Sequence, residues 1–358
     1  MITTRRSIVS YLALSGIGWV VAYQLKKPAP RRSENIDSKE KAAAATLQPT
    51  PDPIRLQVEA FRTRMHELFA GARFAELETV AEEMRSQKAL FGDGGWKLVE
   101  FYESLPPPAT EPEHVWEKAE ALHEDWLAAK PQSLTAHLAC AEFLTSFAWK
   151  ARGSGSAATV TEVGRRLFLE RLTAGRDILK KARDLPGSDP VWWAQALRIG
   201  RGLSWPGANL DALAEEGHAN APDFWRSDIA RANSLLPRWQ GKPGDWEAYA
   251  EKAATRPDGL GAEVYARIVI FMLYYYDHVF RQSKASWPRT REGLEQLRKK
   301  YPDALELTSY AALLAAMAED QATAQGMFAA LGDAYLPKVW KKPERFVHCK
   351  NWAQTGKW

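Results

Sequence analysis

The sequence predicts an all-α protein, an irregular α-solenoid of helix pairs preceded by an N-terminal membrane or export helix. Three observations support this fold class. Apolar residues recur at helical spacing from Ile54 onward, period-two alternation is not sustained anywhere, and prolines fall where helix pairs need turns. The chain has 358 residues, 46% of them hydrophobic, which is enough to build a globular core.

Residues 1–25 are predicted to be a signal anchor or an export signal. Basic pairs at 5–6 and 26–27 flank 18 uncharged residues, Ile8 to Leu25, about 27 Å as a helix. As an anchor, residues 8–25 would hold the chain in a bacterial inner membrane as a single-pass protein with its body in the periplasm. A cleaved signal peptide, with Val20 to Ala22 at the cleavage spacing, would instead leave a soluble periplasmic protein. Thr4 to Val9 also resembles a twin-arginine export signal, and basic residues on both flanks leave the orientation open.

Residues 26–53 are predicted to be a disordered linker, because they are rich in Pro, Ala and charge and almost lack large apolar side chains. The first 53 residues also carry the whole net charge of +4, whereas the other 305 residues contain 40 charges of each sign. A neutral body argues against nucleic acid as a partner, because phosphate binding needs clustered basic residues.

Residues 54–358 are predicted to be a helical-repeat domain. One-sided apolar stripes mark three early helices, with apolar positions at Val58, Phe61, Met65 and Leu68, then at Phe74, Leu77, Val80 and Met84, and then at Val115, Ala119, Leu122 and Trp126. Prolines suit the first turns of later helices, at Pro131, Pro190, Pro222 and Pro302. The 32 residues from Pro190 to Pro222 approach the length of a two-helix repeat. The other intervals are not multiples of it, so the predicted repeat is degenerate.

Several segments resemble known helical proteins. The tail, residues 301–333, resembles a tetratricopeptide-like unit, with small residues where two helices would cross. RFAELETVAEEMR, DGGWKLVEFYESL, FAWKARGSGSAATV, DPVWWAQALRIG and LLPRWQGKPGDWEAYA resemble an uncharacterised bacterial family, a domain of unknown function with tetratricopeptide-like helices. The resemblance covers about half of the chain and implies a helical fold. It implies no particular activity.

The sequence offers no signature of catalysis, cofactor binding or metal binding. The seven histidines form no HExxH pair, the two cysteines form no CxxC, and the GxSxG, GxxxxGK[ST] and GxGxxG motifs are absent. Cys140 lies in the apolar run AHLACAEFL and is interpreted as an inert core residue. Whether it pairs with Cys349 is left open. The fifteen tryptophans are interpreted mainly as fillers between helices, with platforms for sugar rings or peptides as the alternative.

Trp149, Arg152, Arg238 and Trp239 form the candidate binding surface. Arg152 closes a helix that carries Trp149, so it could face an anionic group or bond the free carbonyls at the helix end. The stretch PRWQGKPGDW is interpreted as a corner between two helices, in which Asp245 caps the second helix. Arg238 and Trp239 are the positions in this corner to be tested for binding.

The function expected is that of an exported or membrane-anchored helical-repeat protein, a scaffold that binds a protein or peptide without catalysis. The alternative is a cell-envelope enzyme that acts on peptidoglycan or a related polymer, with tryptophans as sugar platforms and a carboxylate pair as acid and base. No such pair stands out in the sequence.

Overall fold

The computed structural model describes residues 38–153 and 159–358. Within these residues the chain forms 18 α-helices, and its only bridges of β type are two isolated ones. The prediction of an all-α protein is therefore confirmed. The predicted membrane or export segment, residues 8–25, lies outside the described residues. None of the described helices combines the length and hydropathy that a membrane crossing requires.

The helices of the first half are α1 (Ser38–Thr46), α2 (Pro53–Ala70), α3 (Phe74–Ser86), α4 (Lys97–Glu103), α5 (Glu113–Ala129), α6 (Leu134–Arg152), α7 (Glu162–Arg183), α8 (Val191–Gly202) and α9 (Gly207–Asn220). Those of the second half are α10 (Arg226–Ser234), α11 (Asp245–Ala254), α12 (Ala262–Met272), α13 (Val279–Gln282), α14 (Trp287–Lys300), α15 (Leu305–Met317), α16 (Gln321–Leu331), α17 (Pro337–Trp340) and α18 (Pro343–Thr355).

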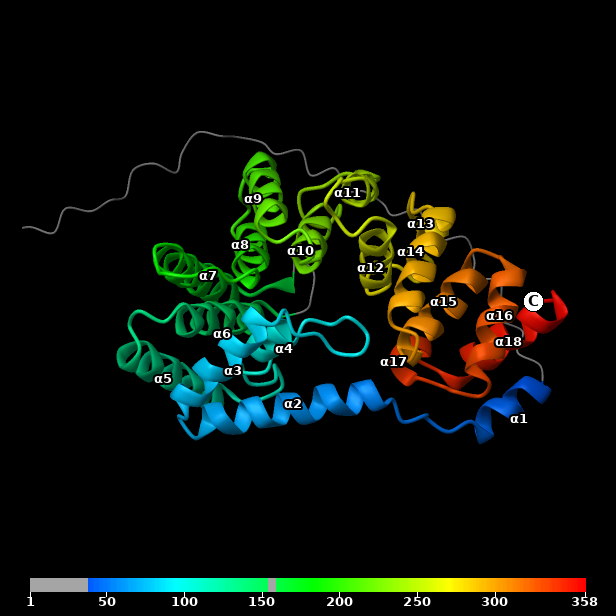
Figure 1. Ribbon diagram of the computed structural model, residues 1–358, viewed down its shortest axis with the longest axis horizontal. Helices are drawn as coiled ribbons and strands as arrows, with labels where there is room; N and C mark the ends of the chain where they lie inside the picture. The colour runs from blue at the N-terminus through cyan, green and yellow to red at the C-terminus, as the bar shows by residue number, and fades with distance from the viewer. Residues whose placement is uncertain (1–37, 154–158) are drawn as a thin grey trace, which may run out of the picture.

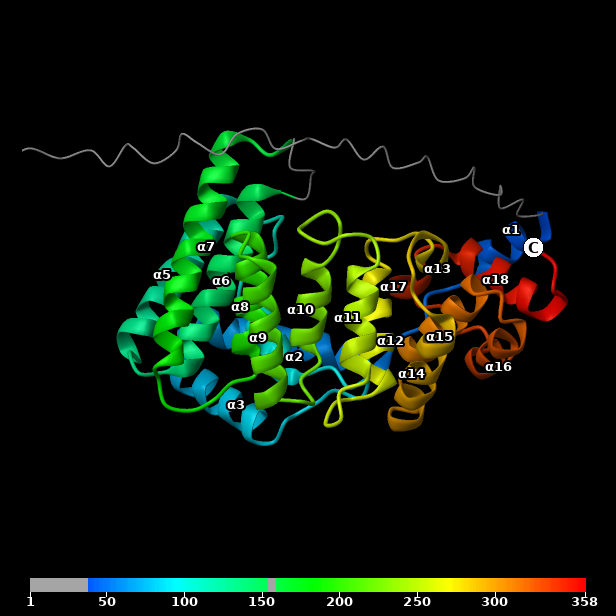
Figure 2. The same cartoon turned by 90° about the horizontal axis from the view of Figure 1, so that it is seen from above.

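From α5 to α16 the helices follow one another along the long axis of the molecule, whereas α1 lies at the far end beside α18 and α2 runs along the length, as Figures 1 and 2 show. α8 packs against both α6 and α10, and α10 packs in turn against α12. Each of these helices is followed by a helix that packs back on it, namely α7, α9, α11 and α14. α8, α10 and α12 begin 35 and 36 residues apart, close to the length of a two-helix repeat.

The second half of the predicted linker is folded, which corrects the prediction for residues 38–53. α1 packs against α18, where Ala44 is buried and the Glu40 carboxylate contacts His348 (3.1 Å) and Asn351 (3.0 Å). The N–H of Thr50 donates to the Tyr335 carbonyl at 2.8 Å. An alanine-rich helix has little apolar surface of its own, but its small side chains permit close packing on a helix supplied from elsewhere.

The loop between α3 and α4 extends from the N-terminal half to the C-terminal half (Figure 1). The carbonyl of Gly94 accepts a hydrogen bond from the Trp225 indole at 3.3 Å. Gly94 has a φ of +77°, and a Cβ there would lie 2.4 Å from Arg267 and 2.5 Å from Tyr301. Only glycine fits this approach without displacing its neighbours. The loop is thus also an inter-element contact.

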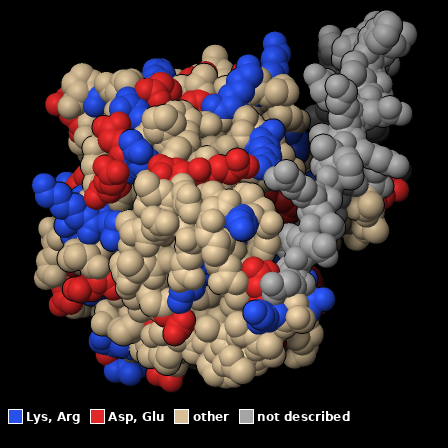
Figure 3. Space-filling model, turned by 90° about the vertical axis from the view of Figure 1, so that its right-hand side faces the viewer, with Lys and Arg blue, Asp and Glu red and all other residues tan. Residues whose placement is uncertain are grey.

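Two clusters of buried apolar residues form the core, one built from α2 to α8 and the other mainly from α8 to α18. Leu213 and Trp225 pack against both clusters. Four tryptophans are almost completely buried within them, Trp116, Trp126, Trp246 and Trp340. These four side chains fill space between helices, as the sequence predicts. Figure 3 views the end of the molecule where α16 and α18 lie, and uncharged surface occupies much of it. α16 contains no charged residue.

Candidate functional site

The C-terminal ends of α6, α8, α10 and α12 meet at one edge of the molecule. α6 and α8 contribute residues of their last turns, and α10 and α12 contribute residues that directly follow them. We call this group the arginine–tryptophan cluster; its members are Trp149, Arg152, Arg201, Arg238, Trp239 and Tyr275. The structure therefore brings together all four residues of the candidate binding surface and adds Arg201 and Tyr275.

Three guanidinium groups share two indole rings in this cluster. Trp149 and Trp239 pack edge to face, with ring centroids 5.6 Å apart. The Arg201 guanidinium carbon lies 5.3 Å from the Trp149 centroid and 5.0 Å from that of Trp239. Arg152 is at 5.4 and 5.6 Å from the same two rings, and Arg238 is 5.5 Å from Trp239. These distances are those of cation–π contacts.

Arg201 lies in the least solvated part of the cluster. Its Nε and Nη1 atoms are inaccessible to solvent and have no hydrogen-bond partner among the described residues. Burial lowers the pKa of Arg201 to about 10, and the guanidinium groups of Arg198, Arg238 and Arg152 act in the same direction against an opposing effect of Tyr275. Arginine nevertheless stays protonated at neutral pH. The cluster is thus a local concentration of positive charge on a body whose charges balance.

Arg152 makes the structural contact that its sequence position predicts and also faces the aromatic rings of the cluster. Its Nη1 donates to the carbonyl of Gly153 at 3.2 Å, just past the end of α6, which is the expected contact of a basic residue in a last turn. Its guanidinium also faces the two indoles. Burial and the charge of Arg238 lower the pKa of Arg152.

A cavity of about 220 Å³ lies beside the cluster, and Arg201 belongs to both. Residues of α4, α6, α8 and α10 line it, together with Phe271 of α12. Its apolar wall includes Val99 and Ile229, and its polar wall includes Glu142, Gln195, Arg198 and Asn233.

The two carboxylates of the cavity are already paired. Both oxygens of Glu142 lie 2.8 Å from Nη1 of Arg198, and Glu103 pairs with Arg226. Burial raises the pKa of Glu142, against the opposing effect of Arg198. The positive charge of Arg201 therefore remains in excess inside the cavity.

Two amide side chains of the cavity present acceptors. Oε1 of Gln195 and Oδ1 of Asn233 are inaccessible to solvent and have no hydrogen-bond partner among the described residues. Gln195 is 1% exposed and Asn233 is 7% exposed. Such buried polar atoms are costly unless something pairs with them; the described residues also bury unpaired atoms outside the cavity, as in His123 and Trp340.

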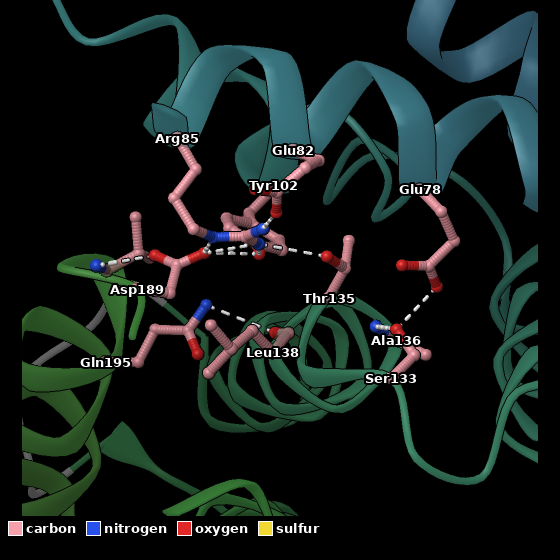
Figure 4. Close-up of polar contacts among 11 residues, drawn as sticks. Glu78, Glu82, Arg85, Tyr102, Ser133, Thr135, Ala136, Leu138, Asp189 and Gln195 are labelled. Atoms are coloured by element: carbon pink, nitrogen blue, oxygen red, sulfur yellow. Dashed lines mark hydrogen bonds and ion pairs between the residues drawn. The ribbon is translucent and has the colours of Figure 1, made fainter. Parts of the chain in front are cut away.

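A buried network supports one wall of the cavity (Figure 4). Asp189 accepts hydrogen bonds from the Tyr102 hydroxyl at 2.8 Å and from Arg85 at 2.9 Å, and Arg85 also donates to Thr135. These residues join α3, α4 and α6 to the turn before α8. Tyr102 itself lines the cavity. Gln195 lies close to this network and donates to the carbonyl of Leu138 at 3.2 Å.

The stretch PRWQGKPGDW is a corner that also supplies two residues of the cluster. It joins α10 to α11, and a Cβ at Gly241 would lie 1.8 Å from the carbonyl oxygen of Leu235. The predicted cap differs in detail. Asp245 is the first residue of α11, and its carboxylate accepts from the N–H of Lys242 at 2.7 Å rather than from an amide of α11. The stretch can therefore be a structural corner between α10 and α11 and still supply Arg238 and Trp239 to the proposed binding surface.

Sequence reasoning missed Arg201, Tyr275 and the residues of the cavity. The signal for Arg201 was its spacing, because Arg198 and Arg201 lie three apart in ALRIGRG at the end of one helix. Nothing in the sequence distinguishes which of them has a carboxylate partner.

The cysteines and histidines provide no alternative site. Cys140 is 7% exposed, and burial raises the pKa of its thiol to about 12, so it is protonated and unreactive at neutral pH. Cys140 and Cys349 lie in different hydrophobic clusters. Within residues 38–153 and 159–358, no group of three His, Cys, Asp or Glu side chains is arranged to hold a metal ion.

Fold and site together define a helical, repeat-like protein with a cationic and aromatic surface beside a polar cavity. Comparisons of the chain with protein-family models, with curated proteins and with solved structures find no match. Its function is therefore argued from the site.

Proposed function

We propose that this protein is an exported or membrane-anchored α-solenoid of tetratricopeptide-like helix pairs that acts as a scaffold for a protein or peptide partner. Its binding surface is the arginine–tryptophan cluster. The observation that carries this proposal is that Trp149, Arg201 and Trp239 meet at one edge of the molecule. They come from the end of α6, the end of α8 and the loop after α10.

Repeat geometry supports the proposal. When helix pairs of similar length stack side by side, equivalent positions of successive repeats form a continuous surface, and such surfaces bind extended partners. Trp and Arg are the side chains most enriched where binding energy concentrates. Nε and Nη1 of Arg201 have no hydrogen-bond partner among the described residues, and side chains at binding sites commonly give up some stability in this way.

Full-length protein carrying a C-terminal tag, used as bait in cell-envelope extract, tests this proposal. A bound partner should be retained by the original protein and reduced at least tenfold by Trp239→Ala. Trp192→Ala is the matched control, since Trp192 is also partly buried but contacts Arg183 and the Leu179 carbonyl away from the cluster. Equal retention by both variants would exclude the cluster as the binding surface.

The localisation rests on the uncharged run at residues 8–25 and its basic flanks. Protease added to spheroplasts should digest the body of a C-terminally tagged protein. Fractionation then distinguishes a membrane-anchored body from a soluble periplasmic one. A body protected from protease would contradict export.

The alternative of an envelope enzyme receives less support from the site. Glu103 and Glu142 both line the cavity, yet each is paired with an arginine, Arg226 and Arg198 respectively. A glycoside-hydrolysing pair needs one carboxyl group to donate a proton and the other to stay available to water or sugar.

A further inference from the structure

The cavity beside the arginine–tryptophan cluster offers buried hydrogen-bond donors and acceptors that the described residues do not satisfy. Building on the proposed function, we infer that the partner binds through an acidic peptide segment. One carboxylate of this segment enters the cavity and pairs with Arg201. An N–H group of the same segment donates to Asn233 or Gln195.

The charge of the site selects an oxyanion. Arg198 is offset by Glu142 and Arg226 by Glu103, whereas Nε and Nη1 of Arg201 have no partner among the described residues. Arg238, which is exposed, adds positive charge at the rim. A segment with several carboxylates matches this distribution better than a single anion, since one charge is bound inside and others face the rim.

The acceptors of the cavity favour a peptide over an inorganic anion. Oδ1 of Asn233 and Oε1 of Gln195 need N–H or O–H donors. Sulfate offers only acceptors, and hydrogen phosphate at neutral pH adds only its own O–H, whereas a peptide presents N–H groups in series. A peptide brings carboxylates and backbone N–H groups together, so it satisfies both kinds of buried atom.

The dimensions of the site limit what enters it. A volume of 220 Å³ holds several water molecules, since one needs about 10–15 Å³ of such space. That space accommodates one acidic side chain with a few backbone atoms. The remainder of the segment would lie over the aromatic rim, which Tyr274, 80% exposed and in edge contact with Tyr275, extends toward solvent.

The first test measures binding of fluorescein-labelled hexaglutamate to the full-length protein by fluorescence anisotropy, with labelled hexaglutamine as the uncharged control. Hexaglutamate should bind at least tenfold more tightly than hexaglutamine. Arg201→Met should weaken hexaglutamate binding at least tenfold. Arg281→Ala, which removes an exposed arginine paired with Glu319, should leave it unchanged. Equal binding of the two peptides, or equal binding by Arg201→Met, would overturn the inference.

Two further variants separate the cavity from general attraction to a basic rim. Arg238 is exposed, so Arg238→Ala should weaken binding at low salt and little at 500 mM salt. Asn233→Leu keeps every charge and should still weaken binding about threefold, because it removes an acceptor. Circular dichroism verifies folding. If Arg201→Met does not fold, Arg201→Lys is measured in its place and should bind hexaglutamate at least threefold more weakly. Unchanged binding by Arg201→Lys would contradict the inference.

Competition experiments distinguish this inference from the proposed function. If inorganic phosphate displaces hexaglutamate at micromolar concentration, the ligand class is phosphoryl and the acidic-peptide inference is wrong. If a partner is retained through Trp239 but hexaglutamate does not displace it, the scaffold function stands and this inference fails. If hexaglutamate binds through Arg201 while no partner depends on Trp239, the acidic-peptide specificity of the cavity stands and the scaffold function fails.

Discussion

Arg198 and Arg201 lie one turn apart on α8, yet the charged groups around the two guanidinium groups differ. Arg198 compensates Glu142, whose side chain is 3% exposed. Arg201 instead lies among other guanidinium groups, with two nitrogens that no described residue accepts from. Breaking a buried ion pair is strongly unfavourable because it leaves one charge uncompensated, whereas removing an uncompensated charge relieves a cost.

Arg198→Met should therefore lower the free energy of unfolding by about 3–5 kcal/mol, the typical effect of leaving a buried partner charged and alone. Arg201→Met should leave this free energy unchanged or raise it. Urea unfolding followed by circular dichroism measures both variants. Equal losses of stability in the two would show that Arg201 is a structural residue, against the site proposed here.

His123 gives a prediction about acid sensitivity. Its ring lies between Phe69 (4.5 Å) and Phe143 (4.8 Å), and burial lowers its pKa from 6.5 to about 3. Below pH 6.5 the unfolded chain therefore binds a proton that the folded protein does not. The contribution of His123 to the free energy of unfolding is therefore constant above pH 6.5. It falls by about 1.4 kcal/mol per pH unit as the pH is lowered from 6.5 toward 3.

His123→Phe should flatten this pH dependence while leaving stability near pH 8 little changed, because the site is apolar and aromatic. Denaturant unfolding of both proteins at several pH values between 8 and 4 gives the comparison. The same slope in the two proteins would mean that other groups control acid sensitivity.

The burial of individual residues was only partly predictable. On α5 the sequence predicts a buried stripe at Val115, Ala119, Leu122 and Trp126, and the structure buries Ala119 and Trp126. It also buries Trp116 and His123 in place of Val115 and Leu122. Both stripes have helical spacing, and a sequence cannot show that aromatic neighbours from α2 and α6 surround His123. Arg201 was missed for the same reason, since its distinction depends on the nearby carboxylates being paired with other arginines.

At the scale of elements, the docking of α1 onto α18 has a direct test. Ala44 is 2% exposed and Ala43 is exposed, so Ala44→Asp places a charge in the contact and Ala43→Asp does not. Ala44→Asp should release α1 and speed amide hydrogen exchange in both α1 and α18. Ala43→Asp should exchange like the original protein. Identical exchange in the two variants would contradict a stable contact.

The helices α2, α3 and α5 were predictable because each has its own apolar stripe, and some later helix starts were predictable from prolines. α1 was not predictable, because its stability comes from α18, which lies some three hundred residues further along the chain. Composition describes what a segment can bury by itself. It cannot show that a small-residue helix meets a complementary partner.

At the scale of the whole molecule, Trp225 connects the two hydrophobic clusters. It packs against both, bonds the carbonyl of Gly94, and lies under the Arg267 guanidinium at 4.5 Å. Trp225→Ala should therefore separate thermal unfolding into two transitions, since each cluster has its own core. Calorimetry measures this. Trp192→Ala, which removes a tryptophan packed against one cluster only, should retain the transition pattern of the original protein.

A single calorimetric transition with an unchanged width in Trp225→Ala would show that the two clusters are coupled elsewhere.

The all-α class of the molecule followed from periodicity. The meeting of four helix ends at one edge did not, because it depends on how each helix pair turns relative to the last. The candidate residues were identified separately, as ends of helices, and only the fold makes them neighbours.

The contact between α1 and α18 also determines how the protein responds to mechanical load. Both ends of the described chain emerge at the same end of the molecule, where Trp358 stacks on Trp352 and Glu40 contacts His348 (Figure 1). A force applied between Ser38 and Trp358 therefore acts first on the contact between α1 and α18. The helices that carry the arginine–tryptophan cluster come under tension only after α1 has separated from α18.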